Sequence, residues 1–186
     1  MKIALITFDN FTDLDLILHW DILNRARSIG GMENWSVKIL GTKPTHISTL
    51  GLPIPTSGMI EEAEDADGVI VTSGKGTRVL LDDRFYLSRI RLNPAKQIIG
   101  AQCSGSLVLG ALGLIKGKKV SAYPPILPEL KKYSVELVNS SLVIDNRLAT
   151  ASSCLAGQYL SKWMIESLAG SAVAQKVMET VSPIGE

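Results

Sequence analysis

The chain has 186 residues, of which 46% are apolar and 20% are charged. This composition is typical of a folded globular protein and excludes a disordered one. Nineteen basic and eighteen acidic residues leave a formal net charge of +1, so charge favours neither nucleic acid nor an anionic membrane as a partner.

The sequence does not show the patterns expected of an exported, membrane-spanning or metal-binding protein. Its first residues, MKIALITF, are too short an apolar run for a secretory signal, and no segment approaches the ~20 apolar residues of a membrane span. Cys103 and Cys154 are too few for a disulfide framework and lack metal-ligand spacing with His19 or His46. We expect one cytoplasmic domain over residues 1–186, with free thiols, no metal and no cofactor.

The first half of the chain alternates apolar runs with turn residues. The pattern predicts strands at 2–8, 35–41 and 68–74, a helix from 13 to the Gly30-Gly31 pair, and an irregular or hairpin excursion at 42–60. The run GVIVTSG is continuously apolar up to its turn, which is typical of a strand covered on both faces.

The second half continues this alternation. It predicts helices at 77–92, 105–112, 154–169 and 171–180, a buried strand at 96–102, and short strands at 119–123, 134–138, 142–145 and 147–151. Strands that alternate with helices, together with two nearly all-apolar internal strands, indicate an α/β fold with a largely parallel sheet.

Functional side chains in such a sheet gather at the carboxyl ends of the strands. Cys103 lies at one of these ends, in the sequence GAQCSG between a strand and a helix. Small neighbours allow the sharp turn of a nucleophile elbow, and the N–H groups at a helix start favour a thiolate. The alternative is an inert, buried cysteine.

A proton partner for Cys103 is expected from another strand end. Asp15 and Asp13 follow the first strand, and partial burial between Leu14 and Leu16 should raise the pKa of Asp15. Either aspartate could instead be a simple helix-start charge. Folding would have to bring Asp15 and Cys103 into direct contact for the chemistry to work.

The turn TSGKG at 72–76 follows the central strand. It lacks the P-loop spacing, but the unshielded N–H of Gly74 could join that of Ser104 in an oxyanion pocket. An ordinary strand-to-helix turn is the alternative. Cys154 is interpreted as a buried small residue near a helix start, and both histidines as structural.

Four blocks of sequence resemble the ThiJ/PfpI superfamily, the flavodoxin-like relatives of class I glutamine amidotransferases. They are KIALITFDNFTDLDL, DGVIVTSGKGTRVLLDD, QIIGAQCSGSLVLGALGLIKGKKVSAY and RLATASSCLAGQYLSKWMIESLAGSAVAQKV. The isonitrile hydratase-like branch is the most similar, because Leu14-Asp15 matches its Leu-Asp pair and Cys103-Ser104-Gly105 its Cys-Thr-Gly elbow. The chain departs from the superfamily at Thr72-Ser73, where Pro-Gly is usual, and at Tyr123-Pro124, where His-Trp is frequent.

The resemblance implies a flavodoxin-like three-layer sandwich with a nucleophile elbow, assembled as a homodimer. It implies that Cys103 adds to an electrophilic carbon of a small molecule. In isonitrile hydratase this is the terminal carbon of an isonitrile, which becomes an N-substituted formamide. Asp15 would move the proton, Ser104 would orient water or substrate, and the amides of Gly74 and Ser104 would hold the polarised intermediate. Thr72, Ser73 and Tyr123 would line the pocket. The alternatives are a metabolite-binding regulatory protein and a redox sensor based on Cys103.

Overall fold

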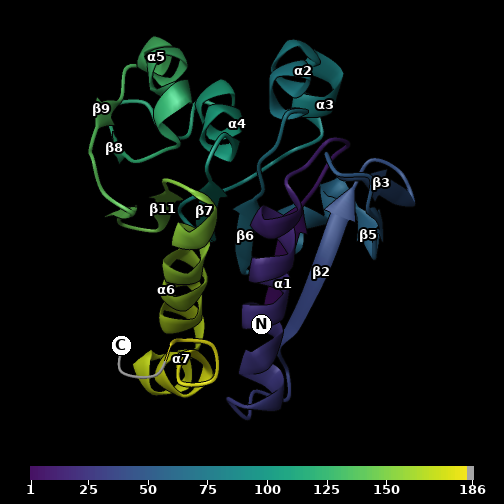
Figure 1. Cartoon of the computed structure of the whole chain (residues 1–186), viewed down its shortest axis with the longest axis vertical. Helices are drawn as coiled ribbons and strands as arrows, with labels where there is room; N and C mark the ends of the chain where they lie inside the picture. Colours follow the sequence, from purple (N-terminus) through teal and green to yellow (C-terminus); the bar gives the residue numbers. More distant parts are fainter. Residues whose placement is uncertain (184–186) are drawn as a thin grey trace.

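The computed structural model describes residues 1–183 and is built on a seven-stranded sheet (Figure 1). The strand order is β10-β11-β7-β6-β1-β2-β5, and only the edge pair β10–β11 is antiparallel. The strands are β1 (Lys2–Ile6), β2 (Ser36–Gly41), β5 (Gly58–Met59), β6 (Gly68–Val71), β7 (Ile98–Gln102), β10 (Leu142–Asp145) and β11 (Leu148–Ala151). The core order β2-β1-β6-β7-β11 is the flavodoxin-like arrangement, in which the order reverses between β1 and β6.

Helices cover both faces of this sheet and give three layers, as expected from the alternating pattern. One face carries α1 (Asp13–Ser28), α6 (Gly157–Ala169) and α7 (Ser171–Met178). In Figure 1, α1 and α6 stand side by side, and α7 lies at the lower end of α6. The other face carries α4 (Gly105–Ala111), α5 (Leu127–Leu130) and the 3-10 helices η1 (Ile60–Asp65) and η2 (Pro124–Ile126). Two further helices, α2 (Thr77–Asp82) and α3 (Arg84–Ser88), also contribute side chains to this layer.

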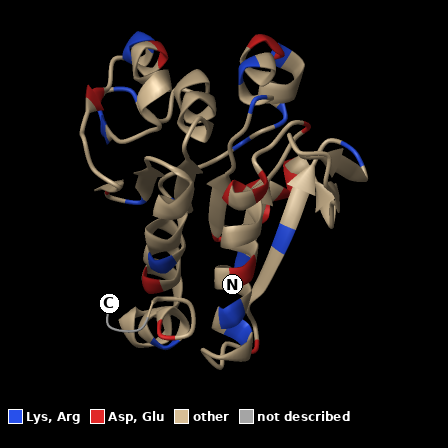
Figure 2. Cartoon of the chain, viewed as in Figure 1, with Lys and Arg blue, Asp and Glu red and all other residues tan. Residues whose placement is uncertain are grey.

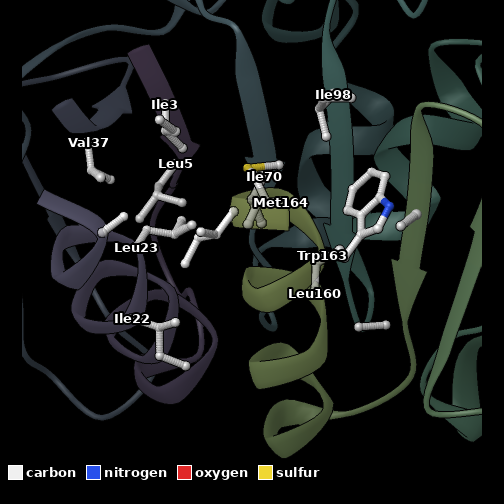
Figure 3. Close-up of a cluster of buried hydrophobic side chains, with 14 of the residues drawn as sticks. Ile3, Leu5, Ile22, Leu23, Val37, Ile70, Ile98, Leu160, Trp163 and Met164 are labelled. Carbon is white, nitrogen blue, oxygen red and sulfur yellow. The ribbon is translucent and has the colours of Figure 1, made fainter. Parts of the chain in front are cut away.

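Alternate residues of each strand enter opposite layers, because successive side chains of a strand point to opposite faces. Ile3 and Leu5 of β1 pack with α1 and α6, whereas Ala4 and Ile6 of the same strand pack in the opposite layer. Figure 3 shows the first layer, in which Met164 of α6 lies in the middle. Ile3 and Leu5 lie on one side of Met164, and Trp163 lies on the other. Both faces of the central strands are therefore covered by apolar side chains. Polar functional groups can be placed only at the ends of the strands.

The predicted excursion at 42–60 contains a short antiparallel hairpin, β3 (Thr45–Ile47) with β4 (Pro53–Pro55), before the edge strand β5. The segments predicted at 119–123 and 134–138 form only two-residue strands, β8 (Lys119–Val120) and β9 (Glu136–Leu137). These two strands pair in parallel outside the main sheet. The remaining 3-10 helices are η3 (Lys131–Tyr133) and η4 (Cys154–Ala156).

The prediction of one helix over 77–92 is wrong. Two short helices, α2 and α3, occupy this segment, and Asp83 between them has an extended backbone with φ −90° and ψ 90°. The Asp83 carboxylate accepts a hydrogen bond of 2.9 Å from the amide of Tyr86 and so caps the start of α3. Aspartate favours such a cap over the interior of a helix, which explains the break.

Charged residues of both signs lie on the same elements rather than on separate faces (Figure 2). Several are joined in ion pairs, such as Arg89 with Glu61 at 2.5 Å and Arg78 with Glu129 at 2.6 Å. No helix within residues 1–183 is both long enough and apolar enough to cross a lipid bilayer.

Candidate active site

Cys103 occupies a sharp turn between β7 and α4, as the small residues around it predict. Its φ is +50°, a left-handed conformation that is uncommon for a residue with a side chain. The turn is tight because α4 starts against the end of β6. A Cβ at Gly105 would lie 2.5 Å from the carbonyl oxygens of Val71 and Thr72, so glycine is required there.

Asp15 is brought to the same edge of the sheet by the first turn of α1. The loop after β1 is fastened to the loop after β6, because the amide of Thr12 donates a 2.7 Å hydrogen bond to the carbonyl of Ser73. Asp15 is 1% exposed. Its Oδ2 accepts a hydrogen bond from the Ser73 hydroxyl, and its Oδ1 has no hydrogen-bond partner among the residues described.

Ser73 lies between the two groups that were expected to touch. The Ser73 hydroxyl also lowers the pKa of the neighbouring Cys103 thiol, whereas the negative charge of Asp15 raises it. Asp15 therefore reaches Cys103 through the hydroxyl of Ser73. A hydroxyl accepts one proton while it donates another, so this arrangement can pass a proton from sulfur to carboxylate.

Burial determines the protonation of both groups. It raises the pKa of Asp15, as predicted, against the influence of Cys154 and Ser73, which favour the carboxylate. It also raises the pKa of Cys103 to about 11, and the negative charge of Asp15 adds to this effect. Ser73 and the backbone amide of Ser104 oppose the rise only in part. The amide at the helix start does favour the thiolate, as predicted, but burial outweighs it and holds Cys103 mainly as the thiol.

The predicted oxyanion pocket is only half available. The amide of Ser104 faces the sulfur of Cys103, but the amide of Gly74 donates a 3.3 Å hydrogen bond to the hydroxyl of Ser104. That hydroxyl is fixed further by Thr77, whose Oγ1 lies 2.9 Å from it. A ligand oxygen could reach the Gly74 amide only by displacing the Ser104 hydroxyl. Thr77 was not expected to take part, since its position inside a predicted helix gave no signal.

A pocket of about 250 Å³ opens above the sulfur. Its lining residues are Thr12, Ser73, Gly74, Lys75, Arg78, Cys103, Ser104, Tyr123, Pro125 and Ile126. Ser73 and Tyr123 line it as expected. Thr72 does not, because its hydroxyl donates to the carbonyl of Ile6 at 2.8 Å and is buried between strands. Within the described part of the chain, no three His, Cys, Asp or Glu side chains are grouped to hold a metal ion.

Cys154 was interpreted as a buried small residue, and this is wrong. It is partly exposed, it begins η4 after β11, and its thiol lies beside the carboxyl group of Asp15. Burial and the nearby charge of Asp15 raise the pKa of Cys154 to about 12. Its sequence position, just after a strand that neighbours β7, is the signal that could have placed it at this edge.

A buried polar cluster supports the site from behind. The side-chain amide of Gln102 donates to the carbonyl of Ser153, which fixes the turn that carries Cys154. His19, one helical turn after Asp15 on the buried face of α1, has its Nδ1 2.7 Å from the hydroxyl of Ser161. Burial lowers the pKa of His19 to about 4, although Gln102 opposes the shift. His19 is therefore a neutral structural residue at pH 7.

We expect His19 to make the fold sensitive to acid. Between pH 6.5 and about 4 the unfolded chain binds a proton at this position and the folded chain does not. Stability from this residue is present above pH 6.5 and is lost as the pH falls, by about 3 kcal/mol in all. Urea unfolding from pH 4 to 7 should give a flatter profile for His19→Gln than for the wild type.

His46 provides the matched control for this measurement. Burial lowers its pKa too, but the carboxylate of Asp9, 3.2 Å from its Nδ1, offsets part of that shift. His46→Gln should therefore flatten the profile less than His19→Gln. Parallel pH profiles for the wild type and His19→Gln would contradict the assignment.

The chain is similar to known proteins in both sequence and fold. A sequence model described as the DJ-1/PfpI family matches residues 1–167. Isonitrile hydratase from Pseudomonas putida is 29% identical over 181 residues, which cover 95% of this chain and 76% of that protein. A ThiJ/PfpI family protein from Pseudomonas syringae superposes with a TM-score of 0.86 at 22% identity, over 98% of this chain and 75% of the other. DJ-1 from Schizosaccharomyces pombe superposes with a TM-score of 0.83 at 17% identity, over 98% and 100% of the two chains.

Proposed function

Because the chain belongs to the DJ-1/PfpI family, we propose that it is a small-molecule enzyme with a cysteine nucleophile, similar in activity to isonitrile hydratase. The substrate would be a neutral isonitrile, and the product its N-substituted formamide. Cys103 is the nucleophile, Asp15 the acid and base, and Ser73 the group that joins them.

The observation that carries this proposal is the placement of the Ser73 hydroxyl at the carboxyl edge of the sheet. It donates a hydrogen bond to Asp15 and neighbours the Cys103 thiol. A thiol with a pKa of about 11 is protonated at neutral pH and is a weak nucleophile. A buried carboxylate with a raised pKa is a stronger base than an exposed one. Transfer of the thiol proton through the Ser73 hydroxyl to Asp15 creates the thiolate and removes a buried negative charge from the carboxyl group.

The reaction can be written with these groups alone. The Cys103 thiolate attacks the terminal carbon of the isonitrile, and Asp15 returns the proton to that carbon, which gives a thioimidate. Water then adds to the same carbon while Asp15 accepts a proton from it. The carbon–sulfur bond breaks and releases an imidic acid, the sulfur takes back the proton held by Asp15, and the imidic acid tautomerises to the formamide. One water is consumed, and the enzyme is unchanged.

The surroundings of the pocket support a neutral substituent on the substrate. A groove of about 730 Å³ adjoins the pocket at Tyr123. Its lining contains apolar residues, an asparagine and several serines, but no charged side chain. An alkyl or aryl group with an amide or hydroxyl could lie there, while the reactive carbon occupies the smaller pocket.

A ligand-binding or regulatory role is the second candidate, and one observation favours it. The raised pKa of Cys103 leaves a mostly protonated thiol, which a binding protein could carry without catalysis. Lys75 at the edge of the pocket would then attract an anionic metabolite.

The test of the proposed activity is turnover of a neutral isonitrile such as benzyl isonitrile. We expect the full chain to form the N-substituted formamide, detected by the formyl proton in NMR, well above the rates of a blank and of heat-denatured protein. Folded protein that yields no formamide over the blank would contradict the enzyme. In that case, saturable binding of small anions in calorimetry would support the second candidate.

A further inference from the structure

Cys154 is a nucleophilic group next to Asp15 that the proposed reaction does not use. β7 and β11 are parallel neighbours, with Gln102 opposite Ala151, and such strands lie about 4.8 Å apart. Cys103 directly follows Gln102, and Cys154 comes three residues after Ala151. Both thiols therefore rise from the same corner of the sheet edge.

Hydrogen bonds fasten the two cysteine turns to each other. The amide of Cys103 donates to the carbonyl of Ala151 at 2.9 Å. The side-chain amide of Gln102 reaches the carbonyls of Ser153 and Cys154, the latter at 3.4 Å. The turn that carries Cys154 is thus held against the residue that precedes the nucleophile.

Asp15 stands next to both thiols. Cys154 lies beside its carboxyl group, and Cys103 is joined to it through Ser73. The Oδ1 atom of Asp15 is buried without a hydrogen-bond partner among residues 1–183, so it has a free lone pair for a further proton. Either thiol can therefore pass its proton to the same carboxylate when it reacts.

We propose that a hydroperoxide oxidises Cys103 and that Cys154 then resolves it to an intramolecular disulfide. This inference uses the pocket geometry and does not depend on hydration of an isonitrile. The disulfide would remove the nucleophile reversibly and would protect it from irreversible oxidation.

The steps balance with a hydroperoxide as the only oxidant. The sulfur of Cys103 attacks the outer oxygen of ROOH, the O–O bond breaks, and Cys103 sulfenic acid and ROH form. Cys154 then gives its proton to Asp15 and attacks the sulfur of the sulfenic acid. The S–O bond breaks, the S–S bond forms, and the leaving hydroxide takes the proton from Asp15 as water. Two thiols lose two electrons in total, and the hydroperoxide gains them.

The test is peptide mapping of the full chain after treatment with tert-butyl hydroperoxide. Trypsin releases Cys103 in the peptide 97–116 and Cys154 in the peptide 148–162, because lysine or arginine bounds both. Without reductant we expect these peptides joined, about 2 Da lighter than their sum. Dithiothreitol should separate them and restore both thiols.

Variants separate resolution from simple oxidation. In Cys154→Ser, peptide 97–116 should gain about 32 or 48 Da in a form that dithiothreitol does not reverse, at least about tenfold more than in the wild type. Leu155→Ala, an exposed change in the same turn, should leave the disulfide intact. Wild-type protein that carries extra oxygens on peptide 97–116 while Cys154 keeps a free thiol would overturn the proposal. A disulfide between two chains would overturn it too. Because neither result requires turnover, failure here is distinguishable from failure of the proposed enzyme.

Discussion

Replacement of Cys103 by alanine is expected to reduce isonitrile turnover by a factor on the order of 10⁴ or more, to near the uncatalysed rate. The reaction begins with a bond from this sulfur to carbon, and the remaining groups have no nucleophile to activate. Ser73 and Asp15 would still be hydrogen-bonded, but there would be no thiol from which they could take a proton. The measurement is initial rate of formamide formation at several substrate concentrations.

Cys154→Ala is the control for the loss of a thiol as such. It keeps the nucleophile and should retain turnover far above that of Cys103→Ala. Circular dichroism should show the fold intact in both variants. Equal turnover by the wild type and Cys103→Ala would exclude covalent catalysis at this site.

The second large effect is expected for Asp15→Asn, which should lower kcat about 10²- to 10⁴-fold, the usual contribution of a general acid or base. An amide cannot accept the thiol proton that Ser73 passes on. In the wild type, kcat should rise with pH as the Asp15 carboxyl group loses its proton, because only the carboxylate is a base. That limb of the pH profile should be absent from the variant.

The same substitution is expected to stabilise the fold. Burial raises the pKa of Asp15 from 3.8, so the folded protein holds this proton more tightly than the unfolded chain does. The wild type therefore loses stability relative to the variant as the pH rises from about 4 through the folded pKa. At pH 7 a neutral amide avoids a buried charge with one unpaired oxygen, and we expect a gain of about 1–3 kcal/mol in urea unfolding.

Asp13→Asn is the matched control, two residues earlier in the first turn of α1. It removes a favourable charge near a helix start, so a small loss of stability, about 0.3–1 kcal/mol, is expected, with turnover retained. If Asp15→Asn behaved like Asp13→Asn in both measurements, Asp15 would be no more than a helix-start charge.

The layers of this fold could be predicted because burial on both faces leaves a simple mark on a sequence. Continuous apolar runs such as 68–71 and 98–101 correspond to β6 and β7, and both lie in the middle of the sheet. The segment 77–92 was mispredicted because its apolar residues fit one helix equally well. The break depends on a hydrogen bond from a single side chain, Asp83, to the backbone.

The candidate site was predictable by position and less so by chemistry. Strand ends indicated Cys103, Asp15 and the turn at 72–76, and topology brings all three to one edge. The pKa of Cys103 could not be read from its neighbours in the chain, since the desolvation that raises it comes from residues far away in sequence. The roles of Ser73 and Cys154 depend on side chains that cross between loops. The homodimer and the cytoplasmic location stay predictions.

The separation of the apolar layers from the rim of the sheet has an evolutionary consequence. Ser73 and Cys103 lie just beyond strand ends and Asp15 lies in the first turn of α1, while the strand interiors fill the two hydrophobic layers. Side chains on the rim can be exchanged without repacking either layer. A lineage built on this scaffold is thus free to diverge in chemistry while its architecture drifts very little.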